Sequence, residues 1–186
     1  MYDDKDDFLN IIEKVKLADI LIFSTPIYLF QIFSLMKIFI ERYHSRGKST
    51  IGTVTQSHLI FHDFEYDLGT KPFVSIIVSD NIERITTENV NSYFDTFSKF
   101  MDAPRVGNII KNGSIMFENS NIISQRVIDT IFNYLEIAGR ELVKIGHISR
   151  KTESKINVSI LPIPSLLFNI MKRTRIGKLK ILEKIN

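Results

Sequence analysis

The chain has 186 residues, 44% of them hydrophobic, and a formal net charge of +3 at pH 7. This length suits a single domain with one sizeable core. The absence of cysteine excludes disulfide frameworks, thiolate-bound metals and cysteine-ligated iron-sulfur clusters. The mild charge and the lack of basic residues interleaved with aromatics argue against a nucleic-acid surface. No apolar run could cross a bilayer and no signal-like segment opens the sequence, so we expect a cytoplasmic location.

The first 42 residues predict a helix, a strand and a second helix. Apolar residues at helical spacing follow two aspartates and predict a helix over 8–17. The short apolar run Ile20–Phe23 predicts a strand covered on both faces, which should end near Pro26 because proline cannot donate to a sheet. From Ile32 onward apolar residues again recur at helical spacing, so a second helix should pack back over the strand.

Several spaced segments of this region resemble, in one register, the central stretch of the NAD(P)H-dependent FMN reductases and iron-sulfur flavoproteins. They are Asp6-Asp7-Phe8, Ala18-Asp19-Ile20, Ser24-Thr25-Pro26-Ile27-Tyr28 and the Ser34 to Arg42 segment with Lys37, Phe39, Ile40 and Glu41. The resemblance implies an α/β domain with a flavodoxin-like three-layer αβα fold and a parallel sheet. Because the chain has no cysteine, it would be a relative without a cluster.

The rest of the chain continues the alternation of strands and helices. Apolar patterns predict strands over 72–79 and 104–110, a helix over 87–102 and a last helix from Ile123 that ends near Gly146. Between them, residues 45–66 are polar and contain two short β-like runs, 51–55 and 59–61. The resemblance places this segment over the flavin or in a dimer contact, whereas an ordinary surface loop is the plainer interpretation.

The phosphate-binding part of such a fold is missing from the sequence. A flavodoxin-like sheet has strand order 2-1-3-4-5, and a turn after its first strand holds the FMN phosphate. The eight glycines stand singly, and nothing resembles the family's G-S-x-R-x-x-G-N-T turn. The chain therefore resembles the C-terminal part of the family, and the fold would be incomplete, lacking the first two strands and the phosphate-binding turn.

An incomplete sheet would leave Ile20–Phe23 at an uncovered edge. Such an edge could be covered by a separately encoded N-terminal half, by a second copy in a homo-oligomer, or by residues missing from a truncated sequence. We expect a truncated or split chain. We also expect two regions: a partial flavodoxin-like domain over 1–150, and a C-terminal extension with a basic helix over 151–186. That helix could dock on its own domain or make weak contact with an anionic membrane surface.

The resemblance also predicts the cofactor-binding residues. It places the first turn against the isoalloxazine ring of FMN and a second turn beside it; the residues are Ser24, Thr25, Pro26, Ile27, Tyr28, Phe30, Ser79, Asp80 and Asn81. On spacing alone, the first turn could equally be a plain strand-to-helix connection. A carboxylate at Asp80 would disfavour the anionic edge of reduced flavin. The His58 and His62 pair lacks a third ligand and the glutamate of zinc proteases, so we predict no metal site.

These features lead to two functional hypotheses. The first is an FMN-dependent NAD(P)H oxidoreductase, or the C-terminal fragment of one, with NAD(P)H as co-substrate. Hydride transfer to flavin requires no protein acid or base, so no catalytic residue is predicted. The alternative is a non-catalytic flavodoxin-like interaction subunit that has lost flavin binding.

Overall fold

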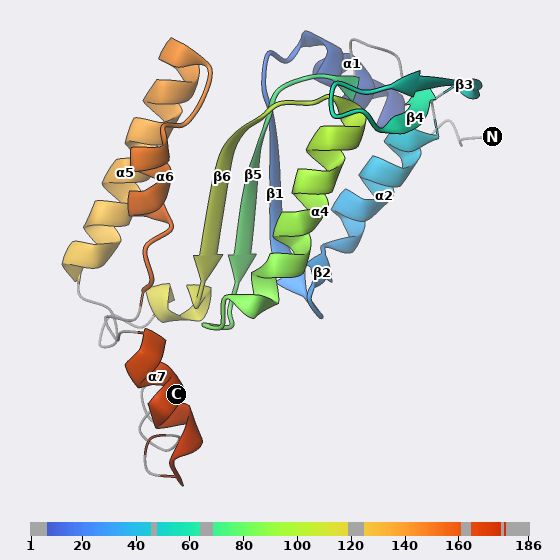
Figure 1. The fold of residues 1–186 in the computed structure, drawn as a ribbon. Helices are drawn as coiled ribbons and strands as arrows, with labels where there is room; N and C mark the ends of the chain where they lie inside the picture. Colours follow the sequence, from blue (N-terminus) through green and yellow to red (C-terminus); the bar gives the residue numbers. More distant parts are fainter. Residues whose placement is uncertain are drawn as a thin grey trace.

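The computed structural model describes residues 7–45, 48–63, 69–118, 125–160, 165–175 and 177. Its centre is a four-stranded sheet in the order β2-β1-β5-β6 (Figure 1). Strands β1 (Leu21–Tyr28), β5 (Phe73–Ser79) and β6 (Arg105–Asn112) run parallel, and the short β2 (Gln31–Ile32) pairs antiparallel with the end of β1.

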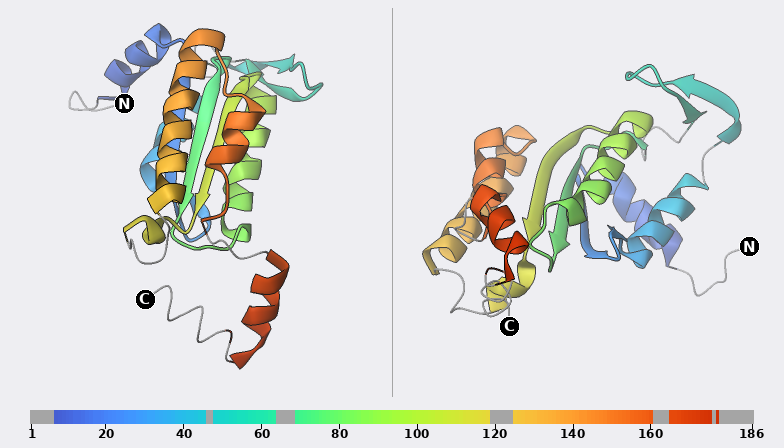
Figure 2. Two further views of the ribbon diagram at one scale, coloured as in Figure 1. Left: turned by 90° about the vertical axis from the view of Figure 1, so that its left-hand side faces the viewer. Right: turned by 60° about the horizontal axis from the view of Figure 1, so that its bottom comes forward.

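Helices cover both faces of this sheet. Figures 1 and 2 show α1 (Phe8–Leu17), α2 (Ser34–His44) and α4 (Ile85–Met101) on one face, and α5 (Gln125–Ile145) with α6 (Arg150–Ile156) on the other. The parallel order β1-β5-β6 corresponds to strands 3-4-5 of the flavodoxin-like order 2-1-3-4-5. The predicted α/β class is therefore confirmed, and the fold is a flavodoxin-like three-layer arrangement.

An aromatic cluster forms the core between β1, β5 and α4. The Phe23 ring centroid lies 5.5 Å from that of Phe73 and 5.9 Å from that of Phe94. Phe73 and Phe94 are fully buried, and Phe97 packs edge-on against Phe73 at 5.5 Å. Each buried side chain of this kind contributes about 1.5–3 kcal/mol, so the cluster is a major source of stability.

Strand β1 is longer than predicted. It continues through Pro26 to Tyr28, so the predicted end near Pro26 is wrong. Leu21 N–H donates towards β5, to the carbonyl of Pro72 at 2.9 Å. Because backbone groups of a strand alternate in direction, Pro26 has its nitrogen on the outer edge, where a missing donor costs no sheet hydrogen bond. The second helix begins at Ser34 rather than Ile32, because Ile32 pairs with Ile27 in β2.

The outer edge of β1 is open in the described part of the chain. Only β2 pairs on that side, opposite Ile27 and Tyr28. On the face that α5 shares, Ile22 is 60% exposed and Ser24 and Pro26 are exposed too. The prediction that this strand is covered on both faces is therefore wrong, whereas the predicted uncovered edge is confirmed.

The polar segment after α2 contains a hairpin of β3 (Lys48–Val54) and β4 (Ile60–Asp63), as its β-like runs predict. The Asp102 carboxylate, at the C-terminal end of α4, accepts a hydrogen bond from Gln56 N at 2.9 Å. The hairpin thus lies at the end of the sheet opposite the carboxyl ends of the parallel strands, and it protrudes from the body (Figures 1 and 2). The β3–β4 hairpin therefore does not lie over the turn that follows β1, and the interpretation that placed it over a flavin there is wrong.

Helix α6 covers the outer edge of β6. Glu153 Oε1 accepts a hydrogen bond from Asn108 N at 2.7 Å, and Asn157 Oδ1 accepts one from Ile110 N at 2.8 Å. These side chains occupy the place of a neighbouring strand, which blunts the edge. Glu153, Asn157 and Val158, which follow the boundary predicted at 150, thus contact β6 directly.

The later helix α7 (Ser165–Arg173) is joined to the loop before α4 by an ion pair between Lys172 Nζ and Glu83 Oε1, at 2.6 Å. In the part of the chain that the structure describes, no helix has the length and apolar character needed to cross a membrane.

The buried Lys111 makes stability depend on pH. Lys111 is 8% exposed, and its Nζ donates a hydrogen bond to Val158 O at 2.7 Å. Burial lowers the pKa of the Lys111 ammonium to about 8. An unfolded lysine has a pKa of about 10.4, so between about pH 8 and 10 the unfolded chain binds more protons than the folded one. The contribution of Lys111 to the free energy of unfolding therefore rises with pH in this window.

We expect the free energy of unfolding of Lys111→Met, relative to that of the wild type, to be higher at pH 7 than at pH 9.5. The reason is that folded wild-type protein carries a buried ammonium at pH 7 and a neutral amine at pH 9.5, whereas methionine is neutral at both. Urea unfolding of both proteins at both pH values measures this. Lys155→Met, at an exposed position of α6, serves as the control. An unchanged difference between Lys111→Met and wild type at the two pH values would contradict the prediction.

Candidate functional site

The candidate site lies at the carboxyl ends of β1 and β5. Pro26 is paired opposite Val78, so the residues that follow each strand emerge side by side at the same edge of the sheet. Ligands of open α/β sheets bind at this edge. The sequence placed two turns here, and the structure brings their backbones together.

A strained hairpin follows β1. Tyr28 pairs with Gln31, which leaves Leu29 and Phe30 as a two-residue loop with φ angles of 46° and 65°. This is the geometry of a type I′ turn, which normally uses asparagine, aspartate or glycine. Bulky residues in this left-handed region cost on the order of 1–3 kcal/mol each, and such strain concentrates at functional sites.

Three hydrogen bonds, made by Thr25 and Asn89, hold the hairpin in this strained shape. Thr25 is fully buried, and its Oγ1 accepts a hydrogen bond from Phe33 N at 2.9 Å and donates to Pro26 O at 2.9 Å. Asn89 Nδ2 of α4 donates to Phe30 O at 3.2 Å. Thr25 is thus a support for the hairpin, not a surface for a ligand.

The end of the hairpin presents three large apolar side chains to solvent. Tyr28 is 61% exposed, Leu29 90% and Phe30 58%; we call these three residues the apolar tip. The Tyr28 ring packs edge-on against Phe33, with centroids 5.6 Å apart. Exposed apolar residues at one point of a sheet edge are typical of a binding surface.

The second predicted turn is bonded internally. The Ser79 and Thr86 hydroxyl oxygens are 3.2 Å apart, and Asn81 Oδ1 accepts a hydrogen bond from Glu83 N at 2.8 Å. Asp80 Oδ1 accepts one from Ser114 Oγ at 2.5 Å. The side chains of Ser79, Asp80 and Asn81 therefore shape the entry into α4, and the backbone N and O of Asn81 are hydrogen-bonded to Ser79 Oγ and Gly113 N.

The remaining predicted residues lie along β1. Ser24 and Pro26 face outward on the open face, and Ile27 is half-buried. Sequence reasoning missed Leu29, Phe33 and Asn89. The sequence shows that apolar residues follow Tyr28, but no sequence pattern predicts a left-handed turn built from leucine and phenylalanine.

The site fits an aromatic ring better than a phosphate. Tyr28 and Phe30 are both more than half exposed, at the end of the strand that pairs with β5. Among the described residues, no glycine-rich turn connects a strand to a helix N-terminus, which is the usual cradle for a flavin phosphate. The described residues could thus contact the isoalloxazine ring of FMN, but they do not supply a phosphate cradle.

No protein-family model and no curated protein matches this chain. Among solved structures, a Trp repressor binding protein from Bacillus subtilis is similar, with 26% sequence identity and a TM-score of 0.46. The similarity covers 58% of this chain and 64% of that protein, so this chain spans less than two thirds of its length.

Proposed function

We propose that the chain is the ring-binding part of an FMN-dependent NAD(P)H oxidoreductase, with the apolar tip against the isoalloxazine ring. The observation that carries this proposal is the strained, solvent-exposed aromatic tip at the carboxyl end of β1, next to β5. Burying these aromatic rings against a ligand is favourable, and stacking contributes about 0.5–1.5 kcal/mol more per aromatic pair.

The residues of the chain would bind and orient the cofactor. The apolar tip would cover the ring and exclude water from it, while the turn at 79–81 would lie beside its polar edge. A bound flavin would itself supply hydride chemistry with NAD(P)H, so the protein needs no acid or base. The Asp80 carboxylate, which accepts a hydrogen bond from Ser114 Oγ, would repel the negative charge of a reduced flavin at this site.

The cofactor's phosphate would be held by a strand added at the open edge of β1. The unpaired edge and the exposed Ile22 support a parallel strand, followed by a phosphate-binding turn, from outside the described residues. A separately encoded N-terminal half, an additional segment of the same polypeptide, or a second copy in a homo-oligomer would each provide a partner there.

Riboflavin binding tests the role of the apolar tip. We expect Phe30→Ala to weaken riboflavin binding about tenfold, because lost stacking and lost buried area together approach the 1.4 kcal/mol of one decade. Quenching of riboflavin fluorescence by the purified chain measures the dissociation constant. Phe132→Ala is the matched control, since Phe132 is 60% exposed on α5, against 58% for Phe30.

Equal affinity of wild type and Phe30→Ala would remove the apolar tip from the proposal. If folded wild-type protein does not quench riboflavin at all, the non-catalytic interaction subunit becomes the better account. The internally bonded side chains of Ser79, Asp80 and Asn81 favour that second function.

A further inference from the structure

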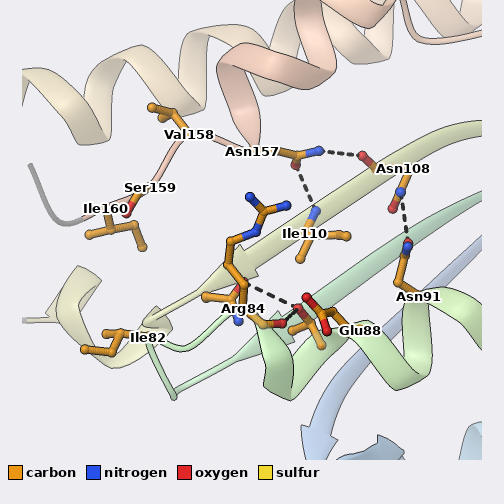
Figure 3. Close-up of a pocket in the computed structure, with 12 residues that line it drawn as sticks. Ile82, Arg84, Glu88, Asn91, Asn108, Ile110, Asn157, Val158, Ser159 and Ile160 are labelled. Atoms are coloured by element: carbon orange, nitrogen blue, oxygen red, sulfur yellow. Dashed lines mark hydrogen bonds between the residues drawn. The ribbon is translucent and has the colours of Figure 1, made fainter. Parts of the chain in front are cut away.

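A polar cavity lies at the β6 edge of the sheet, opposite the edge that carries β2. It has a volume of about 410 Å³ and opens between the first turns of α4, the outer edge of β6 and residues 157–160 after α6 (Figure 3). Its size falls in the range of small-molecule sites. None of its lining residues belongs to the candidate flavin site.

Amide side chains in the cavity wall are fixed by hydrogen bonds. Asn157 is held by Ile110 N at 2.8 Å and by Asn108 O at 2.9 Å. Asn91 Oδ1 accepts from Asn108 Nδ2 at 3.0 Å, and Asn112 Nδ2 donates to Glu83 O at 3.1 Å. Because these side chains are already ordered, they lose little conformational entropy when a ligand binds, which favours binding.

Two opposite charges line the cavity without neutralising each other. Arg84 is the N-cap residue of α4 and Glu88 lies in the first turn of the helix, a separation of four residues at which opposite charges can pair. In the described part of the chain, neither side chain has a hydrogen-bond or ion-pair partner. Figure 3 shows Arg84 extending from α4 towards Asn157, across the space between the helix and residues 157–160.

Apolar side chains complete the lining of the cavity. Ile82 precedes α4, Ile110 comes from β6, and Val158 and Ile160 follow α6. The cavity therefore offers a cation, an anion, fixed amides and an apolar surface to one small molecule. Sites with a few polar groups converging on apolar walls are typical of specific ligand binding.

We infer that this cavity binds a free α-amino acid with an apolar side chain. The ligand's carboxylate would pair with the Arg84 guanidinium, which suits planar, two-point recognition of carboxylates. Its ammonium group would pair with the Glu88 carboxylate, and its side chain would lie against the isoleucines. A simple anion would meet repulsion from Glu88, and a simple cation from Arg84, so the paired charges select a zwitterion.

The test uses L-phenylalanine as the probe and the full chain as the protein. Isothermal titration compares it with 3-phenylpropionate, which lacks the ammonium group, and with phenethylamine, which lacks the carboxylate. We expect L-phenylalanine to bind about tenfold or more tightly than either analogue, since each lost charged hydrogen bond is worth about 1.5–3 kcal/mol.

Variants separate the two charges. Arg84→Gln should abolish the preference for L-phenylalanine over phenethylamine, and Glu88→Gln should abolish its preference over 3-phenylpropionate. Arg140→Gln, on the exposed face of α5, should change neither. Circular dichroism confirms that each variant is folded. The proposal is overturned if L-phenylalanine gives no binding heat, if the analogues bind as well as it does, or if both α4 variants keep the wild-type preferences.

Discussion

Replacing Arg105 with methionine is expected to lower the free energy of unfolding by about 1–3 kcal/mol, the usual cost of leaving a buried acceptor without its donor. The Arg105 side chain is only 9% exposed. It donates to Asp95 Oδ1 at 2.7 Å, to Asn91 Oδ1 at 2.9 Å and to Asn108 Oδ1 at 2.8 Å. Methionine keeps most of the volume, so the loss measures the polar network rather than a cavity.

The cost arises from the groups left behind. Ser75 Oγ is fully buried and lies 2.9 Å from Arg105 Nε, so it would lose a donor that water cannot replace. Burial lowers the pKa of the Arg105 guanidinium, and the hydrogen bond and charge of Asp95 oppose that effect. Arg105 therefore remains charged, and its partners depend on it.

Urea unfolding of the purified variants measures this effect. Arg140→Met is the control, because Arg140 is paired with Glu136 on the surface of α5 and both side chains are more than half exposed. Exposed pairs contribute about 0–1 kcal/mol, so this variant should stay close to wild type. If Arg105→Met is too unstable to purify, Asp95→Asn should show a smaller loss. Wild-type stability in Arg105→Met would contradict the account of the network.

Replacing Thr25 with valine is expected to cost about 1–2 kcal/mol and to weaken riboflavin binding. Valine has nearly the same shape, but it cannot accept the hydrogen bond from Phe33 N, which leaves a partly buried donor unpaired. That bond joins β1 to the segment after the apolar tip, so its loss should release the strained turn at Leu29 and Phe30.

The double readout separates this role from a general loss of stability. Unfolding in urea gives the stability, and quenching of riboflavin fluorescence at low temperature gives the affinity of the folded fraction. Thr130→Val removes a hydroxyl that donates to a carbonyl on the exposed face of α5, so it should leave both measurements unchanged. Unaltered riboflavin affinity in folded Thr25→Val would show that this support does not shape the apolar tip.

The sequence predicted the main strands and helices well where apolar patterns were long. The strand over 73–79 agrees with its pattern because both of its faces are buried. The helix over 85–101 agrees with its pattern because one full stripe of its surface is buried. The prediction failed at Pro26, because a proline on an open edge does not end a strand. Whether an edge is open depends on the strands beside it, which a local pattern cannot show.

The Arg105 network and the apolar tip depend on geometry that no spacing rule contains. An irregularity in the β5–β6 register, between Phe73 and Val74, lets Arg105 and Asn108 both contact Ser75 and Asn91. A regular strand would place residues three apart on opposite faces. The left-handed turn at Leu29 and Phe30 likewise runs against their intrinsic preferences. The resemblance placed both turns at the carboxyl ends of their strands, but it gave no sign of these side chains.

The central claim is that the described residues recognise a flavin's ring and not its phosphate. Fluorescence titrations of the wild-type chain with riboflavin and with FMN test this claim directly, because the two ligands differ only in the phosphate. We predict dissociation constants that agree within about threefold, since no helix N-terminus or glycine-rich turn in the described residues holds the phosphate. An FMN affinity more than about tenfold higher, or no quenching of either flavin, would contradict the account.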